Sequence, residues 1–269
     1  MSLRLQIHTS PEVPLEADTL SPDRLQGLEP RDIASLPLMH GNQKCAVGDF
    51  FTIAGNRDGE IHLEGDLSRV KHLGAGMKTG TLHIHGDAGQ HLGAGMTGGT
   101  LVVDGNAGDW VGPEMTGGRI HVKGNAGHMV CSAYRGSPIG LTGGEIIIDG
   151  SAGNEIGHGM RNGLIAVGGD SGDFTGVNMR AGTIIVLGTL GLRAGAGMKR
   201  GTIASLHDAE LLPTFSYACR YRPPFLGLCL LYLRQSGLAI DDAHVSGTYC
   251  RWSGDSVELN RGEILLYRN

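Results

Sequence analysis

Residues 72–77 read HLGAGM, and the same six letters return at residues 91–96, 19 positions later. The methionine of this motif continues at that interval, with one leucine in its place and a single interval of 26, which is 19 plus 7: Met77, Met96, Met115, Leu141, Met160, Met179 and Met198. A fixed period of this length is the signature of a repeat architecture, in which each unit packs on the next. The repeat therefore decides the fold class.

Each repeat contains one predicted strand and glycine-rich corners. The runs TLHIH at 81–85, TLVVD at 100–104 and TIIVL at 183–187 alternate apolar with other residues, and a period of two over that length is typical of a strand. The corners, such as GAG at 74–76 and 195–197, suit turns because glycine takes a positive φ without penalty. This pattern predicts an all-β solenoid whose coils stack about 4.8 Å apart.

Two ladders of apolar residues are expected to fill the interior of the solenoid. The first contains Ile61, Leu82, Leu101, Ile120, Ile146, Ile165, Ile184 and Ile203, and the second contains Leu63, Ile84, Val103, Val122, Ile148, Val167 and Val186. The methionines are expected to stack inside as well. We interpret them as core filling rather than a metal or redox site, because thioethers fill irregular gaps well.

Two non-repetitive segments flank the repeats, which occupy 51–206. Residues 1–50 carry helix-start signals, SP at 21–22 and EP at 29–30, and are interpreted as an N-terminal cap. Residues 207–269 are interpreted as a C-terminal extension with a helix from Pro223 to Gly237 and two strands near 248–252 and 263–267. Caps are expected because an open last coil leaves an unpaired strand edge.

Composition excludes several function classes. The net charge of −5 provides no basic field for nucleic acid. The cysteines lack any C-x-x-C pair, which argues against disulfides, zinc and iron–sulfur clusters and favours buried thiols in a reducing cytoplasm: Cys45, Cys131, Cys219, Cys229 and Cys250. No signal-peptide pattern opens the sequence, and the longest apolar run, 226–233, is too short to span a bilayer. We predict a cytoplasmic protein with no membrane contact.

Sequence patterns for catalysis are missing. The stretch 74–80 superficially resembles a phosphate-binding loop, but it lacks the G-K-[ST] ending and has near copies in the other repeats, which favours a structural role. No G-x-S-x-G motif occurs, and carboxylates are scattered. We predict no catalytic residue.

Histidines form the most ambiguous set. His62, His83 and His121 occupy equivalent outward positions, and His72 and His91 are expected to stack at a shared corner position. Such a column is able to bind metal. A solvated or interface ladder is favoured instead, because the repeat aligns equivalent positions with or without a ligand and no carboxylate at a recognisable spacing orients the rings. We therefore predict no metal site.

Three surface features indicate a partner protein. The outward column that begins at His62 becomes apolar in later coils, at Val102, Ile147, Ala166 and Ile185, and a large exposed apolar face needs a cover. Arg161, Arg180 and Lys199 place like charges about 4.8 Å apart in backbone spacing on successive coils, which is unfavourable unless an acidic group pairs with them. The alternative is that water simply solvates the three charges. A seven-residue insertion around 134–138 interrupts the regular repeat, and such insertions commonly mark a binding face.

The coil repeat resembles the G-x-G-x-G domain shared by the C-terminal part of glutamate synthase large subunits and the C subunit of formylmethanofuran dehydrogenases. The flanks favour the second family. PEVPLE at 11–16, PLMHGN at 37–42 and VGDFF at 47–51 resemble its N-terminal extension. PTF at 213–215, YRP at 221–223 and Y-x-R-W-x-G-D at 249–255 are similar to the version in the bacterial formyltransferase/hydrolase complex.

The resemblance implies a right-handed parallel β-helix of about eight 19-residue coils with short helical N- and C-terminal caps. It also implies a non-catalytic scaffold subunit of a complex that converts formyl-tetrahydromethanopterin via formyl-methanofuran to formate. The expected partners are an amidohydrolase-like hydrolase subunit with a metal centre, a formyltransferase subunit and a further dehydrogenase-like subunit. Methanofuran-type carrier and tetrahydromethanopterin would serve the complex, with no cofactor bound by motifs of this chain.

A sharper hypothesis assigns the basic column, Arg161, Arg180 and Lys199, to the glutamate-rich tail of the carrier or to an acidic partner, with Arg193 and Arg200 as further candidates. Two alternatives stay open. The chain could be the C subunit of a redox-active molybdenum or tungsten formylmethanofuran dehydrogenase, or a stand-alone structural module of the glutamate synthase type. The 19-residue spacing disfavours a hexapeptide-repeat acyltransferase, whose coil has 18 residues.

Overall fold

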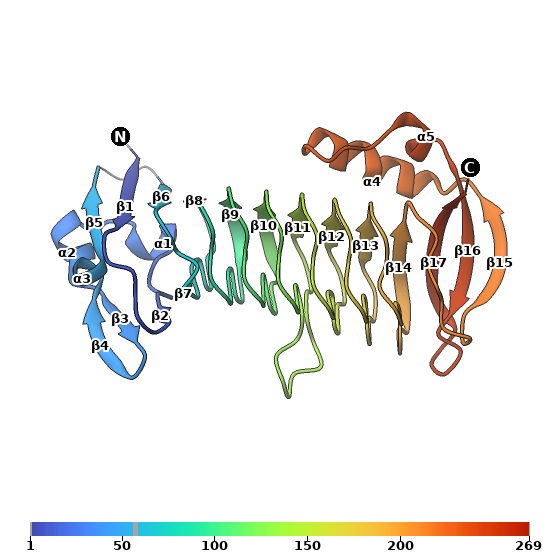
Figure 1. Cartoon of the computed structure of the whole chain (residues 1–269), viewed down its shortest axis with the longest axis horizontal. Coiled ribbons are helices and arrows are strands. Elements are labelled where there is room, and N and C mark those ends of the chain that lie inside the picture. The colour runs from blue at the N-terminus through green and yellow to red at the C-terminus, as the bar shows by residue number, and fades with distance from the viewer. Residues whose placement is uncertain (1, 56–58, 269) are drawn as a thin grey trace.

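The computed structural model describes residues 2–55 and 59–268 as an elongated, mostly β molecule (Figure 1). Its body is a row of parallel strands: β6 (Glu60–Glu64), β8 (Thr81–His85), β9 (Thr97–Val103), β10 (Gly117–Val122), β11 (Glu145–Ile148), β12 (Leu164–Val167), β13 (Thr183–Val186) and β14 (Arg200–Ser205). Neighbouring strands pair so that equivalent repeat positions face each other, as Leu82 faces Leu101. The strands predicted from the repeat are confirmed.

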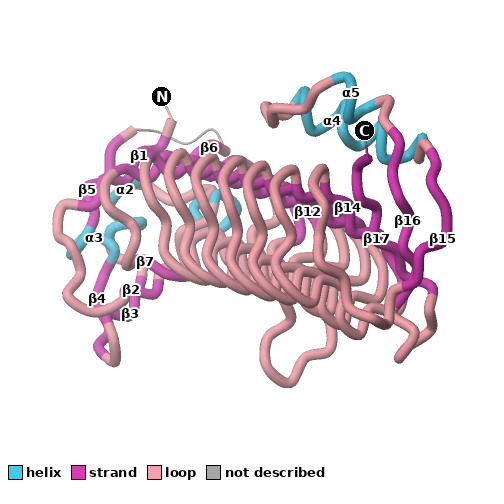
Figure 2. The backbone as a smooth tube through the Cα atoms, turned by 45° about the vertical axis from the view of Figure 1, so that its right-hand side comes forward, coloured by secondary structure: helices cyan, strands magenta, loops and turns pink. Residues whose placement is uncertain are grey.

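The chain winds through stacked turns between these strands, as Figure 2 shows. A second, narrow ladder of parallel bridges joins the same turns through Leu67, Ala88, Ala107, Ala126, Ala152, Ser171 and Leu190. Short polar side chains support it: Asn106 Oδ1 accepts from the backbone N–H of Asn125 at 2.8 Å, and Asn125 Oδ1 accepts from that of Ser151 at 2.8 Å. Each turn is thus hydrogen-bonded to the next on more than one side.

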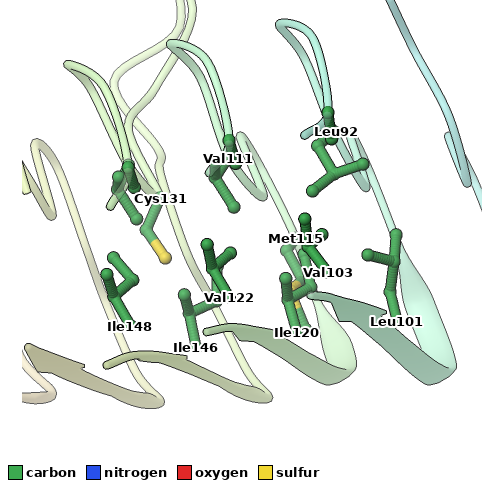
Figure 3. Packing of buried hydrophobic residues seen from close by; sticks show 14 of the residues in the cluster. Leu92, Leu101, Val103, Val111, Met115, Ile120, Val122, Cys131, Ile146 and Ile148 are labelled. Atoms are coloured by element: carbon green, nitrogen blue, oxygen red, sulfur yellow. The ribbon is translucent and has the colours of Figure 1, made fainter. Parts of the chain in front are cut away.

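The core consists of the predicted ladders. Both apolar ladders are at most 3% exposed, and the six methionines of the repeat with Leu141 are fully buried. Figure 3 shows Leu101, Ile120 and Ile146 from successive strands in a row, with Val103, Val122 and Ile148 beside them. Burial of each such side chain contributes about 1.5–3 kcal/mol, and the regular stacking sets the register.

Glycine at the corners is required by both conformation and space. Gly93 has a φ of +62°, and a Cβ there would lie 2.5 Å from Cδ1 of Ile120. Gly112 has a φ of +60°, and a Cβ there would lie 2.4 Å from Cδ1 of Ile146. No side chain fits at such a separation, so the G-x-G corner lets the backbone approach the isoleucine ladder.

The N-terminal segment closes one end of the rod. Strand β1 (Leu3–Ile7) pairs in parallel with β6, which places Leu3 beside Ile61 and Leu5 beside Leu63, and β5 (Phe51–Ala54) pairs with β1 in the antiparallel sense. The helices expected from the SP and EP signals form. The remaining elements are β2 (Leu15–Glu16), α1 (Pro22–Leu25), α2 (Pro30–Ala34), β3 (Pro37–His40), β4 (Gln43–Ala46), α3 (Val47–Phe50) and β7 (Val70–Lys71).

The C-terminal segment closes the other end. β17 (Arg261–Arg268) pairs in parallel with β14 and continues the core ladder, with Ile264 beside Ile203. β16 (Thr248–Gly254) and β15 (Ser216–Tyr221) follow as antiparallel strands. The predicted helix is α4 (Pro224–Gln235), and a short α5 (Asp242–Val245) follows it. The sequence patterns predicted α4, β16 and β17 but neither β15 nor α5.

Helix α4 corrects one expectation about the surface. The outward residues Ile147, Ala166 and Ile185 are fully buried, because Leu226, Leu230 and Leu233 of α4 pack in one cluster with them. Figure 1 shows α4 lying along the tops of the later strands of the row. For these three residues the inference that a partner protein covers the apolar column was wrong, since the chain covers them with its own helix; Val102, earlier in the column, stays half-buried outside this cluster.

The cysteines and the helices bear on two smaller predictions. All five cysteines are free thiols, but only Cys131 is buried and Cys219 is exposed, so the expectation of uniformly buried thiols was wrong. Within residues 2–55 and 59–268, no helix has both the length and the apolar character that crossing a bilayer requires.

Candidate functional surfaces

Arg161, Arg180 and Lys199 emerge from the same corner of three successive turns. Each directly follows a buried residue of the methionine ladder, and its backbone N–H donates to the previous turn at 2.7–2.8 Å. The acceptors are the carbonyls of Leu141, Met160 and Met179. The structure therefore brings the three predicted residues together as one column, which we call the basic column.

Of the three cations in the basic column, one is paired with a carboxylate of the described chain. Lys199 Nζ lies 3.3 Å from Oε2 of Glu258, in the turn between β16 and β17. Among the described residues, Arg161 and Arg180 form no ion pair with a carboxylate. No sequence spacing could have indicated the role of Glu258, since it lies outside the repeat.

The basic column borders a surface hollow that also involves the insertion. Pro138 of the insertion, Arg180, Lys199 and Glu258 line a hollow of about 190 Å³ together with His158, Gly159 and Asn178. Two of the surface features noted in the sequence therefore meet at one place. A hollow with cationic walls and a single carboxylate is suited to a small anionic group, such as a second carboxylate.

The insertion is anchored by an aromatic stack. Tyr134 stacks on Trp110 with ring centroids 4.9 Å apart, and its hydroxyl lies 2.8 Å from Nδ1 of His91. His91 in turn stacks on His72 at 4.7 Å, as predicted. Burial raises the pKa of Tyr134 to about 12, so its hydroxyl stays protonated. Figure 1 shows the loop between β10 and β11, which contains the insertion, protruding from the row of strands.

Of the two further basic candidates, Arg200 directly follows Lys199 in the chain, and Arg193 lies in another corner of the repeat. Arg193 has its guanidinium 5.2 Å from the ring centroid of Phe174, which is a cation–π arrangement. Arg200 is exposed at the start of β14. Neither residue lines the hollow beside the basic column.

The outward histidines have carboxylate partners, contrary to the expectation from the sequence. His83 Nε2 and His85 Nδ1 lie 3.0 and 2.9 Å from Oδ2 of Asp104, and His121 Nε2 lies 2.8 Å from Oδ1 of Asp149. Burial opposes ionisation of Asp104, but hydrogen bonds from Lys123 and the two histidines hold the pKa of its carboxyl well below its usual range.

The signal for these pairs was present in the sequence. In the next strand His83 faces Val102, and Asp104 stands two positions after Val102. In the same way His121 faces Ile147, and Asp149 stands two positions after Ile147. Side chains two residues apart on one strand share a face, so this diagonal is within reach. A comparison of directly equivalent positions alone misses it.

Burial disfavours the thiolate form at three of the five cysteines. Burial raises the pKa of Cys131 well above its ordinary value, and it raises the pKa values of Cys45 and Cys229 as well. Reactive cysteines need the opposite shift, because the thiolate is the nucleophile.

Comparisons with known proteins agree with this architecture. The GXGXG motif family model matches residues 53–215. The C subunit of molybdenum-containing formylmethanofuran dehydrogenase 1 from Methanothermobacter marburgensis is 48% identical over 80 residues, covering 29% of this chain and 20% of the relative. The C subunit of tungsten-containing formylmethanofuran dehydrogenase 2 from Methanothermobacter wolfeii is 41% identical over 82 residues, covering 29% and 30%. The matched segment spans less than a third of these curated relatives.

A solved structure matches almost the whole chain. It is a chain of the formyltransferase/hydrolase complex FhcABCD from Methylorubrum extorquens, crystallised in complex with methylofuran. The TM-score is 0.92 at 34% identity, and the match covers 99% of this chain and 100% of that chain. On these grounds the chain belongs to the GXGXG motif family and is a homologue of the C subunit of the formylmethanofuran dehydrogenases.

Proposed function

We propose that this chain is a non-catalytic scaffold subunit of a formyltransferase/hydrolase complex, which converts formyl-tetrahydromethanopterin via formyl-methanofuran to formate in one-carbon oxidation. The observation that carries the proposal is the full-length match to a chain of FhcABCD at a TM-score of 0.92. The rigid stack of hydrogen-bonded turns supports it, since such a rod holds surfaces in fixed positions.

The proposal includes the finer description of the fold and its setting. The stacked turns form a right-handed β-helix of about eight coils over 51–206, capped by 1–50 and 207–269. The partners are an amidohydrolase-like hydrolase subunit with a metal centre, a formyltransferase subunit and a dehydrogenase-like subunit, in the cytoplasm. Methanofuran-type carrier and tetrahydromethanopterin are used by those partners.

The basic column has a role in this proposal: it contacts the glutamate-rich tail of the carrier or an acidic partner. Arg161 and Arg180 form no ion pair with a described carboxylate, and Glu258 holds Lys199 at 3.3 Å. An incoming carboxylate can pair with the guanidinium of Arg180 in the hollow, where bidentate hydrogen bonds are available to it. Carboxylates spaced along a flexible tail suit three cations on successive turns.

Reconstitution with and without this chain tests the scaffold role. The hydrolase and formyltransferase partners are combined with methanofuran-type carrier, and the release of formate from formyl-tetrahydromethanopterin, by transfer of the formyl group to the carrier and its hydrolysis there, is measured. We expect no turnover by this chain alone and a stable complex only when it is present. Turnover by the isolated chain, or assembly that is unchanged without it, would overturn the proposal.

Charge reversal tests the basic column separately. In the assembled complex, Arg161→Glu with Arg180→Glu should weaken carrier binding by several-fold to about tenfold, because each exposed ion pair contributes about 0.2–1 kcal/mol and the reversed charges also repel the carboxylates. The salt dependence of binding should also become shallower. Arg222→Glu, an exposed arginine before α4, is the control and should leave the affinity unchanged. Equal affinities for all variants would refute the contact.

One observation supports a second candidate. The curated relatives are C subunits of molybdenum- and tungsten-containing formylmethanofuran dehydrogenases. In that case the chain would scaffold a redox-active complex, and a molybdopterin- or tungstopterin-binding subunit would co-purify with it. Metal analysis of the purified complex separates the two candidates.

A further inference from the structure

The outward face of the sheet changes character along the rod. Under α4 it carries Ile147, Ala166 and Ile185, all fully buried. In the earlier strands, which α4 does not cover in Figure 1, the same column carries His62 and His83, which face each other across β6 and β8. A third histidine, His85, follows on β8 and joins them.

These three histidines converge. One nitrogen from each of His62, His83 and His85 lies within 4.8 Å of the other two. His62 Nδ1 and His85 Nε2 are 2.8 Å apart, and the rings of His83 and His85 have centroids 4.0 Å apart. The side chains are 14%, 24% and 36% exposed, respectively. The cluster is therefore partly shielded yet open to an ion from solvent.

In each of the three rings, one nitrogen lies near a carboxylate and the other nitrogen is left to face the cluster. His85 Nδ1 and His83 Nε2 lie 2.9 and 3.0 Å from Oδ2 of Asp104. His62 Nε2 lies 3.4 Å from Oε1 of Glu60. A carboxylate that accepts the N–H of one ring nitrogen leaves the lone pair of the other nitrogen for a metal, and this arrangement is typical of ligating histidines.

Asp104 is itself fixed in place. Lys123 Nζ donates to its other oxygen, Oδ1, at 2.7 Å. The lysine holds the carboxylate while Oδ2 faces the two rings, so Asp104 orients the rings rather than serving as a freely moving ligand. The strands that carry these residues are hydrogen-bonded in register, which gives the cluster a rigid base.

We propose that Nδ1 of His62, Nδ1 of His83 and Nε2 of His85 bind a divalent transition-metal ion of the Zn²⁺ class, with the fourth position open to water or to a group from a partner. Tetrahedral Zn²⁺ with Zn–N bonds of about 2.0–2.1 Å needs ligand nitrogens about 3.4 Å apart. The nitrogens of the cluster lie within 4.8 Å of one another, and the pair His62 Nδ1 and His85 Nε2, at 2.8 Å, has to separate by about 0.6 Å to reach that spacing. The ion would join β6 to β8 close to the N-terminal cap.

His121 provides a matched control on the same face. It occupies the column of His83 and has the same diagonal carboxylate, with Nε2 2.8 Å from Asp149. Its neighbours in the column are Val102 and Ile147, so no second imidazole stands beside it. His121 therefore has a carboxylate partner but no neighbouring histidine. Among the described residues, His62, His83 and His85 are the one group of three possible ligands that converge.

The test uses the full chain and Co²⁺ as a spectroscopic probe, with competition by Zn²⁺. We expect one Co²⁺ per chain with the visible absorption of a tetrahedral site, displaced by one Zn²⁺. His83→Ala and His85→Ala should each weaken binding at least about tenfold, and Asp104→Asn should weaken it about 10- to 100-fold, the usual effect of losing an orienting carboxylate. His121→Ala should bind like the natural chain.

The absence of saturable Co²⁺ or Zn²⁺ binding would overturn the site. Equal losses of affinity in His85→Ala and His121→Ala would do so as well, because they would indicate general binding to surface histidines. Circular dichroism melting verifies that each variant folds. X-ray absorption of the Zn²⁺-loaded natural chain needs no variant. Scattering from fewer than two imidazoles there would also contradict the assignment.

Discussion

The hydroxyl of Tyr232 on α4 donates to the carboxylate of Glu145, whose two oxygens lie 2.6 and 2.7 Å away. Glu145 is the first residue of β11 and stands 87 positions earlier in the chain. Arg119 Nη1 lies 3.3 Å from the same hydroxyl and 3.3 Å from the Glu145 carboxylate. These contacts hold α4 over the outward apolar column. An apolar surface that the sequence pattern assigned to a partner is therefore an internal interface.

Truncation of the helix face should destabilise the C-terminal half. Leu230 is fully buried against the sheet, so Leu230→Ala should lower the free energy of unfolding by about 2–5 kcal/mol through lost burial and the cavity left behind. Leu228 on the same helix is 68% exposed, and Leu228→Ala should change it by less than about 0.5 kcal/mol. Urea denaturation followed by circular dichroism measures both. Equal effects would contradict the packing of α4.

The anchor of the insertion should control its susceptibility to protease. Tyr134→Ala removes the stacking on Trp110 and the contact with His91, so the insertion should open more often. Arg135 is the next residue and is exposed, which makes limited trypsin digestion a direct measurement. Cleavage after Arg135 should be faster in Tyr134→Ala and intermediate in Tyr134→Phe, which keeps the ring. Identical rates in all three proteins would show that the aromatic stack does not hold the insertion.

The stability of the fold should fall in mild acid because of His91. Burial lowers the pKa of His91 below its ordinary 6.5, and the neighbouring His72 and Lys71 add to this shift against the opposing effect of Glu16 and Asp109. Between the folded pKa and 6.5 the unfolded chain binds more protons, so stability rises with pH through this window and is lost as pH falls below 6.5.

The His91→Gln variant isolates that contribution. His62 also has a lowered pKa, chiefly through burial, so some pH dependence should remain in the variant. Melting temperatures between about pH 5 and pH 8 should show a smaller fall in His91→Gln than in the natural chain. A fall of the same size in both proteins would mean that His91 does not titrate as described.

One corner position of the repeat has a left-handed backbone, so a glycine substitution there should give a more stable protein than an alanine substitution. His72, His91, Trp110, Met129, Glu155, Phe174 and Arg193 all have φ near +60°. This conformation costs a residue with a Cβ about 1–2 kcal/mol. Glu155→Gly should therefore be more stable than Glu155→Ala by about 1 kcal/mol, with both variants losing the weak contact to His158 at 3.6 Å. Chemical denaturation measures the difference, and a more stable alanine variant would contradict the strain.

The repeat made most of the rod predictable. A 19-residue interval fixes which residues face each other, so the core ladders, the buried methionines and the stacking of His72 on His91 follow from the sequence alone. Equivalent positions also placed Arg161, Arg180 and Lys199 on three successive, hydrogen-bonded turns. Periodicity is informative here because each turn repeats the same local physics with the same neighbours.

The features that were missed lie outside that periodicity. Strand β1 extends the core at Leu3 and Leu5 without any repeat spacing to indicate it, and Glu258 reaches Lys199 from a distant turn. The cover of α4 over Ile185 depends on tertiary packing, which no local pattern encodes. The diagonal from His83 to Asp104 was readable in principle, but it requires comparing positions two residues out of register.

The most direct test of the scaffold role is mild affinity purification of this chain from its native host, with mass spectrometry of the proteins that elute in stoichiometric amounts. The proposal predicts an amidohydrolase-like subunit and a formyltransferase subunit in the eluate, with formyl transfer from formyl-tetrahydromethanopterin by the complex and none by the chain alone. Elution of the chain as a lone oligomer, without these partners, would contradict it.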